Sequence, residues 1–355
     1  MSIISKIRDM RMNKDTNKST FKQLFSALSQ VKQRFEEMEA GRRWKKMSAE
    51  QFIKLMITSQ ISREPLLRDI SSSLTNEDLG KEIKLQSISA STLSRRHREL
   101  STEIMRMLFK SLIAEFAQKD GFGGIEKVIG NIYMIDSTTI SLCLTKYRWA
   151  EFRNTKAGVK AHLRLKFGMD GNLPDKVVIT PARPSDRSQM DELVVDETGA
   201  LNLFDRGYND YTKFDEYAEK GVLFITRLKS NAIVEVIADN PVNPDSAIDK
   251  DRIVRLGTGD NRMEHTLRLL KTTDTEGNLV LILTNDFARS AEEIGDLYRY
   301  RWQIELFFKW IKQHLMVKHL YGESPQAVEN QIMTALITYC LLMLLQESCL
   351  RSSAF

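Results

Sequence analysis

The sequence predicts an α/β fold, in which a helical N-terminal region precedes a mixed sheet flanked by helices. Apolar residues recur at helical spacing through the first 120 residues, whereas short apolar runs separated by turns dominate from about residue 128 to 285. A helical pattern returns after residue 290. A glycine-containing break at residues 120–124 separates the two patterns. We therefore expect an all-α region over 1–122 and an α/β domain over 123–355, with a β-rich insertion at about 229–286.

The charge is distributed unevenly along the chain. The chain has 355 residues, 42% of them apolar, and a net charge of +5. The first 120 residues contain 23 basic and 15 acidic side chains, a net charge of +8, while the remainder has a net charge of −3. A protein that binds DNA through its front third would have this distribution, although ordinary proteins also have basic ends.

The cysteines and the hydropathy indicate an intracellular, non-membrane protein. Cys143, Cys340 and Cys349 show no metal-type spacing, and their odd number argues against a disulfide framework. The first residues are polar, so we expect no signal peptide. The longest apolar run, 332–345, is shorter than the ~20 residues that a membrane span needs. We interpret it as a buried core helix and expect a cytoplasmic location with no membrane partner.

The N-terminal region should consist of successive helices. Apolar residues at helical spacing predict a first helix over 21–40. Ser48, with Gln51 three residues later, has the pattern of a capping box that opens the next helix. Pro65 suits the first turn of a third helix. A further helix is expected over 101–118.

Between these helices lies a short basic one. Ser91 is its expected N-cap, and it carries Arg95, Arg96 and Arg98. A helix, a turn and a basic helix form the layout of a helix-turn-helix reader of DNA. A solvated helix in an all-α bundle explains the same pattern equally well. Both interpretations therefore stay open.

The second region should begin with consecutive strands. The apolar run 128–135 ends at Asp136, and a tight turn should lead from it into the next strand. The run 200–204 ends at Asp205. The other expected strands cover 139–144, 162–169, 176–181 and 222–227, with a helix over 210–220, four short β runs in the insertion, and helices over 291–318 and 324–350.

Two aspartates stand directly after apolar strands, where catalytic side chains converge in open α/β sheets. These are Asp136 and Asp205, and Glu305 on a later helix can reach the same edge. A lone aspartate at such a position is more often a turn or cap residue, and Asp196, after two valines, competes with Asp205. Converging carboxylates repel one another and serve chiefly as ligands of Mg²⁺ or Mn²⁺. Two such ions about 4 Å apart promote in-line phosphoryl transfer.

The segment 291–318 predicts one long amphipathic helix. Tyr298, Arg301, Glu305 and Lys312 fall within an arc of about 60° when successive residues are rotated by about 100°. The apolar residues occupy the adjoining face. This polar stripe therefore offers one carboxylate and three groups that can hold phosphate to a cleft.

These motifs resemble those of DDE transposases of the insertion-sequence-4 family. The polar stripe meets the family's Y-x2-R-x3-E-x6-K signature in full. The D-R-G-Y stretch that begins at Asp205 resembles the block around the family's second aspartate, and D-S-T at Asp136 resembles the first block. The long interval between Asp205 and Glu305 suits family members that insert a β domain there.

The resemblance implies an RNase H-like fold and a transposase that cleaves the ends of an insertion sequence and transfers the strands to target DNA. Asp136, Asp205 and Glu305 would be the catalytic residues and would bind two Mg²⁺ ions, which Mn²⁺ can replace. The implied partners are terminal inverted repeats, target DNA and a second copy of the chain in the DNA complex, within the bacterial cytoplasm or nucleoid. The implied phosphate-binding residues are Tyr298, Arg301 and Lys312.

Two alternatives share these features. Another RNase H-like DNA nuclease would use the same carboxylates without needing the insertion or the polar stripe. A non-catalytic relative that acts as a repressor would bind element ends without metal-dependent nicking. Some family members cleave through a DNA hairpin and stack an insertion-domain tryptophan on a flipped base. The chain has no tryptophan between Arg206 and Arg301, so the sequence leaves this step open.

Overall fold

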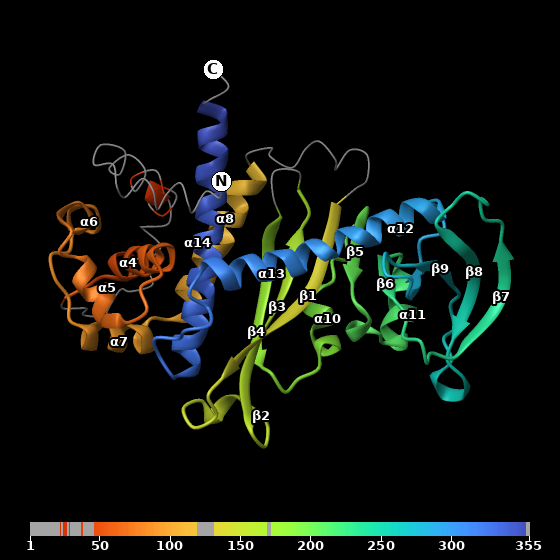
Figure 1. Ribbon diagram of the computed structural model, residues 1–355, viewed down its shortest axis with the longest axis horizontal. Helices are drawn as coiled ribbons and strands as arrows, with labels where there is room; N and C mark the ends of the chain where they lie inside the picture. The colour runs from red at the N-terminus through yellow and green to blue at the C-terminus, as the bar shows by residue number, and fades with distance from the viewer. Residues whose placement is uncertain are drawn as a thin grey trace. The chain divides into compact units, whose positions relative to one another are not determined.

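The computed structural model describes residues 22, 24–26, 28, 37, 46–118, 131–168 and 172–352 (Figure 1). The chain divides into two compact units, and each is described by itself. The helical unit comprises Met1–Gly121, Ile140–Gly158 and Phe308–Phe355, and the sheet unit comprises Phe122–Thr139 and Val159–Phe307. Most of the expected helix over 21–40, and the expected domain boundary near residue 122, lie outside the described residues. The division into 1–122 and 123–355 stays a prediction.

The helical unit is built from capped helices. The predicted capping box is confirmed, because the Ser48 hydroxyl accepts the N–H of Gln51 and the Gln51 side chain accepts the N–H of Ser48. The cap of the basic helix is Ser89 and not Ser91, since the Ser89 hydroxyl is the one that accepts a backbone N–H from the first turn. The elements of the helical unit are α4 (Ala49–Ser62), α5 (Leu67–Ser73), α6 (Glu77–Ile83), α7 (Ala90–Glu99), α8 (Thr102–Gln118), η2 (Arg148–Ala150), β2 (Glu151–Arg153) and α14 (Pro325–Ser352).

The long C-terminal helix α14 forms the centre of this unit, where it contacts α4, α7 and α8. Ile337 and Cys340 on it are completely buried. Within the described residues, one helical segment, Pro325–Gln346, is long and apolar enough to cross a membrane, but 83% of its most apolar window is buried inside the protein. The prediction of a buried core helix is therefore confirmed.

The sheet unit contains a mixed sheet whose strand order is β4-β3-β1-β5-β6, continued by β10-β9-β8-β7. β5 pairs parallel to both β1 and β6, and β4 pairs antiparallel to β3. This order, with a meander on one side of β1 and two parallel strands on the other, is that of an RNase H-like sheet and confirms the predicted fold class. The strands are β1 (Asn131–Leu142), β3 (Lys156–Lys166), β4 (Leu173–Pro181), β5 (Ala200–Phe204) and β6 (Leu223–Arg227).

The prediction of a strand break after Asp136 is wrong. β1 runs without interruption from Asn131 to Leu142, so Asp136 lies inside a strand. The Ser-Thr-Thr-Ile sequence that follows Asp136 explains this, because β-branched residues favour extended backbone. The partner strand β5 does end at Phe204, as predicted. Asp136 is therefore placed where the neighbouring strand stops, although its own strand continues.

Four antiparallel strands between residues 234 and 284 extend the sheet. β10 pairs with β6, and β9, β8 and β7 follow outward in turn. These strands match the four short β runs expected in the sequence, and they add to the existing sheet through β10. They are β7 (Val234–Asn240), β8 (Ile248–Leu256), β9 (Leu267–Thr273) and β10 (Leu279–Thr284).

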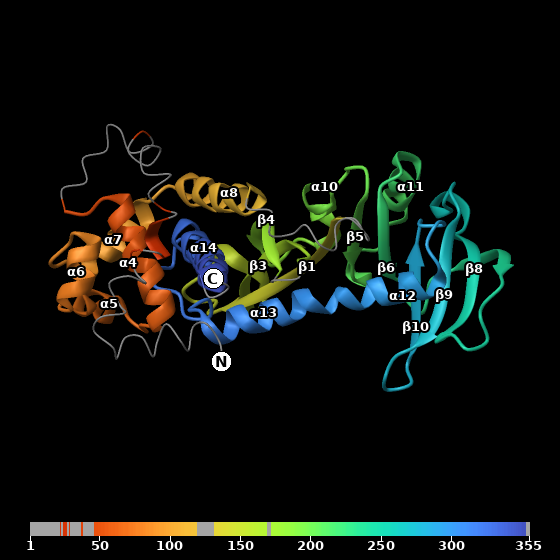
Figure 2. The same ribbon diagram turned by 90° about the horizontal axis from the view of Figure 1, so that it is seen from above.

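Helices cover both faces of this sheet. Figure 2 shows α10 (Met190–Leu193) and α11 (Tyr211–Lys220) on one face and α12 (Ala291–Tyr300) on the other. Under α11, the rings of Phe214 and Phe224 stack 4.7 Å apart, and Phe204 joins them from β5. This aromatic cluster fixes β5 and β6 beneath the helix. The short elements η3 (Asp186–Gln189), η4 (Arg206–Tyr208) and η5 (Gly259–Asn261) complete the unit.

The helix predicted over 291–318 is divided and ends earlier. α12 ends at Tyr300, Arg301 interrupts the pattern, and α13 runs from Trp302 to His314. At the interruption, the N–H of Arg301 donates hydrogen bonds to the carbonyl oxygens of Arg299 and Tyr298. In a regular α-helix the acceptor would be the carbonyl oxygen four residues back. After α13, the loop is held within the helical unit by two buried amides. Gln60 accepts the N–H of Met316, and Gln331 donates to the Met316 carbonyl oxygen.

Candidate active site

Asp136 and Asp205 are brought together by strand register. In the parallel pair of β1 and β5, Ile135 lies opposite Phe204. The residue that follows each of these two is an aspartate, so Asp136 and Asp205 lie next to each other where β5 ends. Asp196, the competing candidate, is exposed and precedes β5 by four residues, at the opposite end of that strand. The geometry therefore favours the pair that includes Asp205.

The D-R-G-Y turn holds Asp205 in place. The Asp205 carboxylate caps η4 by accepting the N–H of Gly207 at 2.8 Å. A Cβ atom on residue 207 would lie 2.9 Å from Asp205 Oδ1. Glycine therefore leaves room for the Asp205 carboxylate to approach the backbone closely. On the other side, the Thr226 hydroxyl donates to the Asp205 carbonyl oxygen and ties the turn to β6.

Asp136 is a largely buried carboxylate with a strongly raised pKa. Its side chain is 19% exposed, and the N–H of Ser137 donates to its Oδ1 at 2.7 Å. The pKa of Asp136 is raised to about 7, and burial is the main cause. The charges of Asp205 and Glu305 also raise this pKa, whereas the Ser137 hydrogen bond and Arg301 lower it. Asp136 therefore interacts electrostatically with both of the other predicted carboxylates.

Arg301 connects Asp136 to Glu305. Its Nη2 donates to Glu305 Oε1 at 2.6 Å, and its Nη1 lies 3.9 Å from Asp136 Oδ2. Burial by itself lowers the pKa of Arg301, but Tyr298, Glu305 and Asp136 together raise it above its ordinary value. The guanidinium is therefore a buried, permanent positive charge between two of the three acids.

Tyr298 lies beneath this guanidinium. The Arg301 guanidinium carbon is 5.8 Å from the centre of the Tyr298 ring, a cation–π distance. Burial raises the pKa of Tyr298 to about 12, so its hydroxyl stays protonated. The residue is 9% exposed, and the Arg301 guanidinium interacts with its hydroxyl and opposes this rise in pKa. Tyr298 and Arg301 thus form a packed pair next to Glu305.

The remaining predicted DNA-binding residues belong to the helical unit. Lys312 lies on α13, seven residues after Glu305, and burial together with Lys318 lowers its pKa. On α7, Arg95 and Arg98 are exposed, whereas Arg96 is only 2% exposed. A basic surface on α7 is therefore formed by Arg95 and Arg98, while Arg96 packs inside the helical unit.

The donor chemistry of the site suits a hard divalent cation. The site offers carboxylate oxygens from Asp136, Asp205 and Glu305. The charges of Asp205 and Glu305 repel the Asp136 carboxylate and so raise its pKa, and a bound cation would relieve this repulsion. Among the described residues, no three acidic, histidine or cysteine side chains are close enough to hold a metal ion in this conformation. Arg301 lies between Asp136 and Glu305 and supplies a positive charge near both carboxylates.

Sequence reasoning missed a fourth carboxylate next to this site. Asp186, the first residue of η3, accepts hydrogen bonds from the Ser137 hydroxyl at 2.8 Å and from Lys160 Nζ at 3.0 Å. The His162 ring is buried next to this carboxylate, with its Nδ1 3.6 Å from Asp186 Oδ1. Asp186 stands in a loop of mixed polar residues and carries no local signal. It could have been found only from the pairing of β3 with its neighbours.

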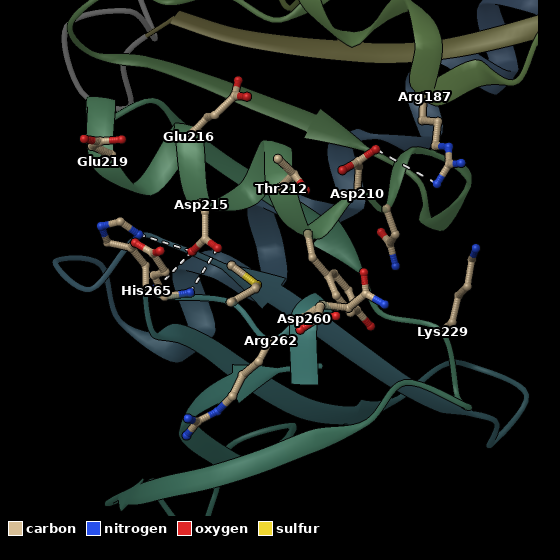
Figure 3. Close-up of a pocket in the computed structure, with 15 residues that line it drawn as sticks. Arg187, Asp210, Thr212, Asp215, Glu216, Glu219, Lys229, Asp260, Arg262 and His265 are labelled. Atoms are coloured by element: carbon tan, nitrogen blue, oxygen red, sulfur yellow. Dashed lines mark hydrogen bonds and ion pairs between the residues drawn. The ribbon is translucent and has the colours of Figure 1, made fainter. Parts of the chain in front are cut away.

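A cavity of about 740 Å³ lies beside α11, outside the carboxylate site (Figure 3). It is lined by α11 and by the connection between β8 and β9. At one end Arg187 lies 4.0 Å from Asp210, and at the other Asp215 accepts the N–H of His265. Six acidic and three basic side chains line the cavity. This negative lining disfavours DNA phosphate, so the cavity is not a continuation of the candidate active site.

Three bacterial proteins resemble the chain over much of its length. A Geobacillus stearothermophilus protein named as a transposase for insertion sequence element IS5377 is 30% identical over 271 residues, 75% of this chain and 69% of that protein. The Sinorhizobium fredii protein named as transposase y4zB is 36% identical over 217 residues, 59% of each chain. A Synechocystis protein named for element IS4SA is 26% identical over 270 residues, 73% of this chain and 72% of that protein.

A solved structure, the piggyBac transposase synaptic complex with hairpin DNA, matches with a TM-score of 0.45 at 12% identity and covers 94% of this chain and 75% of that one. This similarity is too weak to transfer any detail. The family model described as Transposase DDE domain matches residues 130–341, more than half of the chain, and includes Asp136, Asp205 and Glu305. Together with the relatives, this match shows that the chain belongs to the DDE transposase family.

Proposed function

We propose that the protein is a transposase that cleaves the ends of an insertion sequence and transfers the strands to target DNA. The observation that carries this proposal is that Asp136 and Asp205 directly follow the paired residues Ile135 and Phe204. Arg301 then joins Asp136 to Glu305. Membership of the DDE transposase family supports it. The assignment to the insertion-sequence-4 family rests on the polar stripe.

Asp136, Asp205 and Glu305 would hold two Mg²⁺ ions, and Mn²⁺ would substitute for them. When bound, such ions polarise the scissile phosphate and favour deprotonation of the attacking water or hydroxyl. The protein's own contribution is to fix the carboxylates. The Ser137 N–H orients Asp136, and the Gly207 N–H orients Asp205. Because both donors are backbone groups, the carboxylates are oriented before DNA arrives.

Arg301, Tyr298 and Lys312 would hold the phosphates of the element end. The Arg301 guanidinium offers a planar fork of donors, and in the free protein part of that fork is occupied by Glu305. A DNA phosphate would compete for the guanidinium and release Glu305 for its catalytic role. The Tyr298 hydroxyl, which stays protonated, would donate to the same phosphate. DNA binding and assembly of the three acids would then be coupled.

The helical unit would contribute DNA contacts through Arg95 and Arg98, which are exposed on α7. Transposition needs two element ends in one complex, so we expect a homodimer when DNA is bound. The substrate also implies that the protein acts at the bacterial nucleoid. The inverted repeats just outside the coding region are the DNA that it would recognise.

The proposal is tested by excision of the element from a plasmid that carries it with its flanking DNA. Asp136→Asn and Glu305→Gln should reduce excision to background, because each replaces a carboxylate with a poor metal ligand of the same size. Asp196→Asn is the matched control, since this exposed aspartate also follows an apolar pair and should excise normally. Wild-type excision by either active-site variant would overturn the catalytic assignment.

A purified-protein assay separates the alternatives. Cleavage of DNA containing the terminal repeats should stop when EDTA removes divalent cations and resume when Mg²⁺ or Mn²⁺ is added. Equal cleavage of DNA without the repeats would identify a general RNase H-like nuclease. Specific binding of the repeats without nicking in either metal would identify a non-catalytic repressor.

A further inference from the structure

A chain of three polar contacts leads from β3 to the catalytic aspartate of β1. Lys160 Nζ donates to Asp186 Oδ1 at 3.0 Å, and the Ser137 hydroxyl donates to the same oxygen at 2.8 Å. The N–H of Ser137 then donates to Asp136 Oδ1 at 2.7 Å. One residue, Ser137, therefore holds Asp186 with its side chain and Asp136 with its backbone.

Rigid elements supply the fixed ends of this chain. Lys160 lies on β3, which neighbours β1 in the sheet. Lys160 Nζ also donates to the Pro184 carbonyl oxygen at 3.1 Å, which fixes the loop just before Asp186. With a side-chain exposure of 16%, Lys160 is well shielded from solvent. Asp186 is thus held from β3 and cannot move without breaking contacts to both strands.

The charge of Asp186 is compensated within the same cluster. Lys160 is its positive partner, and His162 is not, because burial lowers the pKa of His162 to about 4 and leaves the ring neutral. Asp186 also lies near Asp136 and Asp205. Burial is the main cause of the raised pKa of Tyr208, and the charges of all three carboxylates add to it. Asp186 therefore offers an oriented acceptor beside the catalytic pair, with its own charge balanced.

We propose that Asp186 is a positioning residue of the active site, which acts through Ser137 on Asp136 and is held by Lys160. This inference rests on the proposed function, because it needs Asp136 to be catalytic. A partner of this kind keeps a reacting carboxylate in one orientation without touching the substrate. Neither the sequence motifs nor the family signature includes Asp186 or Lys160.

The test compares Ser137→Ala, Asp186→Ala and the double variant in cleavage of plasmid DNA that carries the element with its flanking sequence. Each single variant should cleave about 10–100-fold more slowly, the usual effect of losing an outer partner of a reacting group. Binding of the same DNA should be unchanged. Because Asp186 acts through Ser137, the double variant should be no slower than the slower single variant.

Two further measurements separate positioning from general destabilisation. Ser137→Thr keeps a hydroxyl and should recover much of the rate that Ser137→Ala loses. Hydrogen exchange of the segment around Ser137 should be faster in Asp186→Ala without any metal or DNA present. Asp191→Ala is the matched control, because this carboxylate is 72% exposed on α10 and pairs with Lys213. It should leave cleavage, exchange and thermal stability unchanged.

Failure of this inference is distinguishable from failure of the proposed function. If Asp136→Asn cleaves at the wild-type rate, the proposed function is wrong. If Asp136→Asn is inactive while Asp186→Ala or Ser137→Ala cleaves normally, only the positioning role is overturned. Multiplicative loss in the double variant would also overturn it, because the two residues would then act independently.

Discussion

At the scale of single residues, the candidate active site depends on close approach between backbone and carboxylate. Gly207 lies beneath Asp205, whose Oδ1 accepts its N–H. The backbone at Gly207 does not have a positive φ angle, so alanine could adopt it. The conflict comes only from the added Cβ, which would lie 2.9 Å from Asp205 Oδ1. Since that oxygen ends a flexible side chain, the carboxylate would move and the backbone would not.

We therefore predict that Gly207→Ala impairs chemistry and spares the fold. Cleavage should fall by about 10–100-fold, because a displaced carboxylate no longer converges with Asp136. The melting temperature should stay the same or rise slightly, as alanine restricts the unfolded chain. Cleavage rates and thermal unfolding of the same preparations check this. A large drop in melting temperature would show that residue 207 has a structural role that its contacts do not explain.

The site also shows which residues a sequence can reveal. Asp136, Asp205 and Glu305 could be selected because each has a local signal, either an apolar strand before it or a helical stripe around it. Asp186 has none, since its importance comes from Lys160 on β3 and Ser137 on β1. Those contacts depend on which strands are neighbours and on the path of the loop after β4. Such information is not carried by any short pattern.

At the scale of elements, a buried ion pair links the added strands to the helix that precedes Glu305. Arg268 on β9 forms a forked contact with Asp251 on β8, and these side chains are 9% and 3% exposed. The same guanidinium donates to the Arg289 carbonyl oxygen, two residues before α12 begins. The pair therefore fixes where the helix that carries Tyr298 starts.

Removing one partner should be strongly destabilising. We predict that Arg268→Met lowers the free energy of unfolding by about 3–5 kcal/mol, because Asp251 would stay buried without a counter-charge. Arg252→Met is the matched control, since its contact with Asp239 on neighbouring β7 is more exposed and should contribute at most about 1 kcal/mol. Urea unfolding of both variants measures the difference. Equal losses would mean that the Arg268 pair is no more important than a surface contact.

Element boundaries show a similar division between local and tertiary information. The sequence predicts β5 at its observed bounds because a mainly apolar run between Gly199 and Asp205 is a complete local signal. The predicted end of β1 is Asp136, yet the strand continues to Leu142. The β-branched residues after Asp136 favour extended backbone, but a Ser-Thr pair also suits a turn, so pairing with a neighbouring strand decides between the two. The interruption at Arg301 has no sequence signal either. Arg301 keeps a helical backbone conformation, and only the partners of its backbone N–H differ from those of a regular α-helix.

At the scale of the whole molecule, the uneven charge of the chain becomes a prediction about DNA binding. The first 120 residues have a net charge of +8 while the rest is slightly acidic. Within the helical unit, Arg95 and Arg98 are exposed on α7, and Arg96 is buried. If α7 lies against the DNA backbone, each exposed arginine displaces a counterion from a phosphate.

The full-length variant with both Arg95→Ala and Arg98→Ala should bind DNA more weakly and with less dependence on salt. The slope of log affinity against log salt should fall by about 2 in magnitude, roughly one for each arginine that no longer neutralises a phosphate. Lys176→Ala is the control, because this lysine lies in the sheet unit and already pairs with Glu192. Fluorescence anisotropy at several salt concentrations measures both slopes. An unchanged slope in the double variant would show that α7 is a solvated helix of the bundle, and the DNA contacts of the protein would then have to come from the polar stripe.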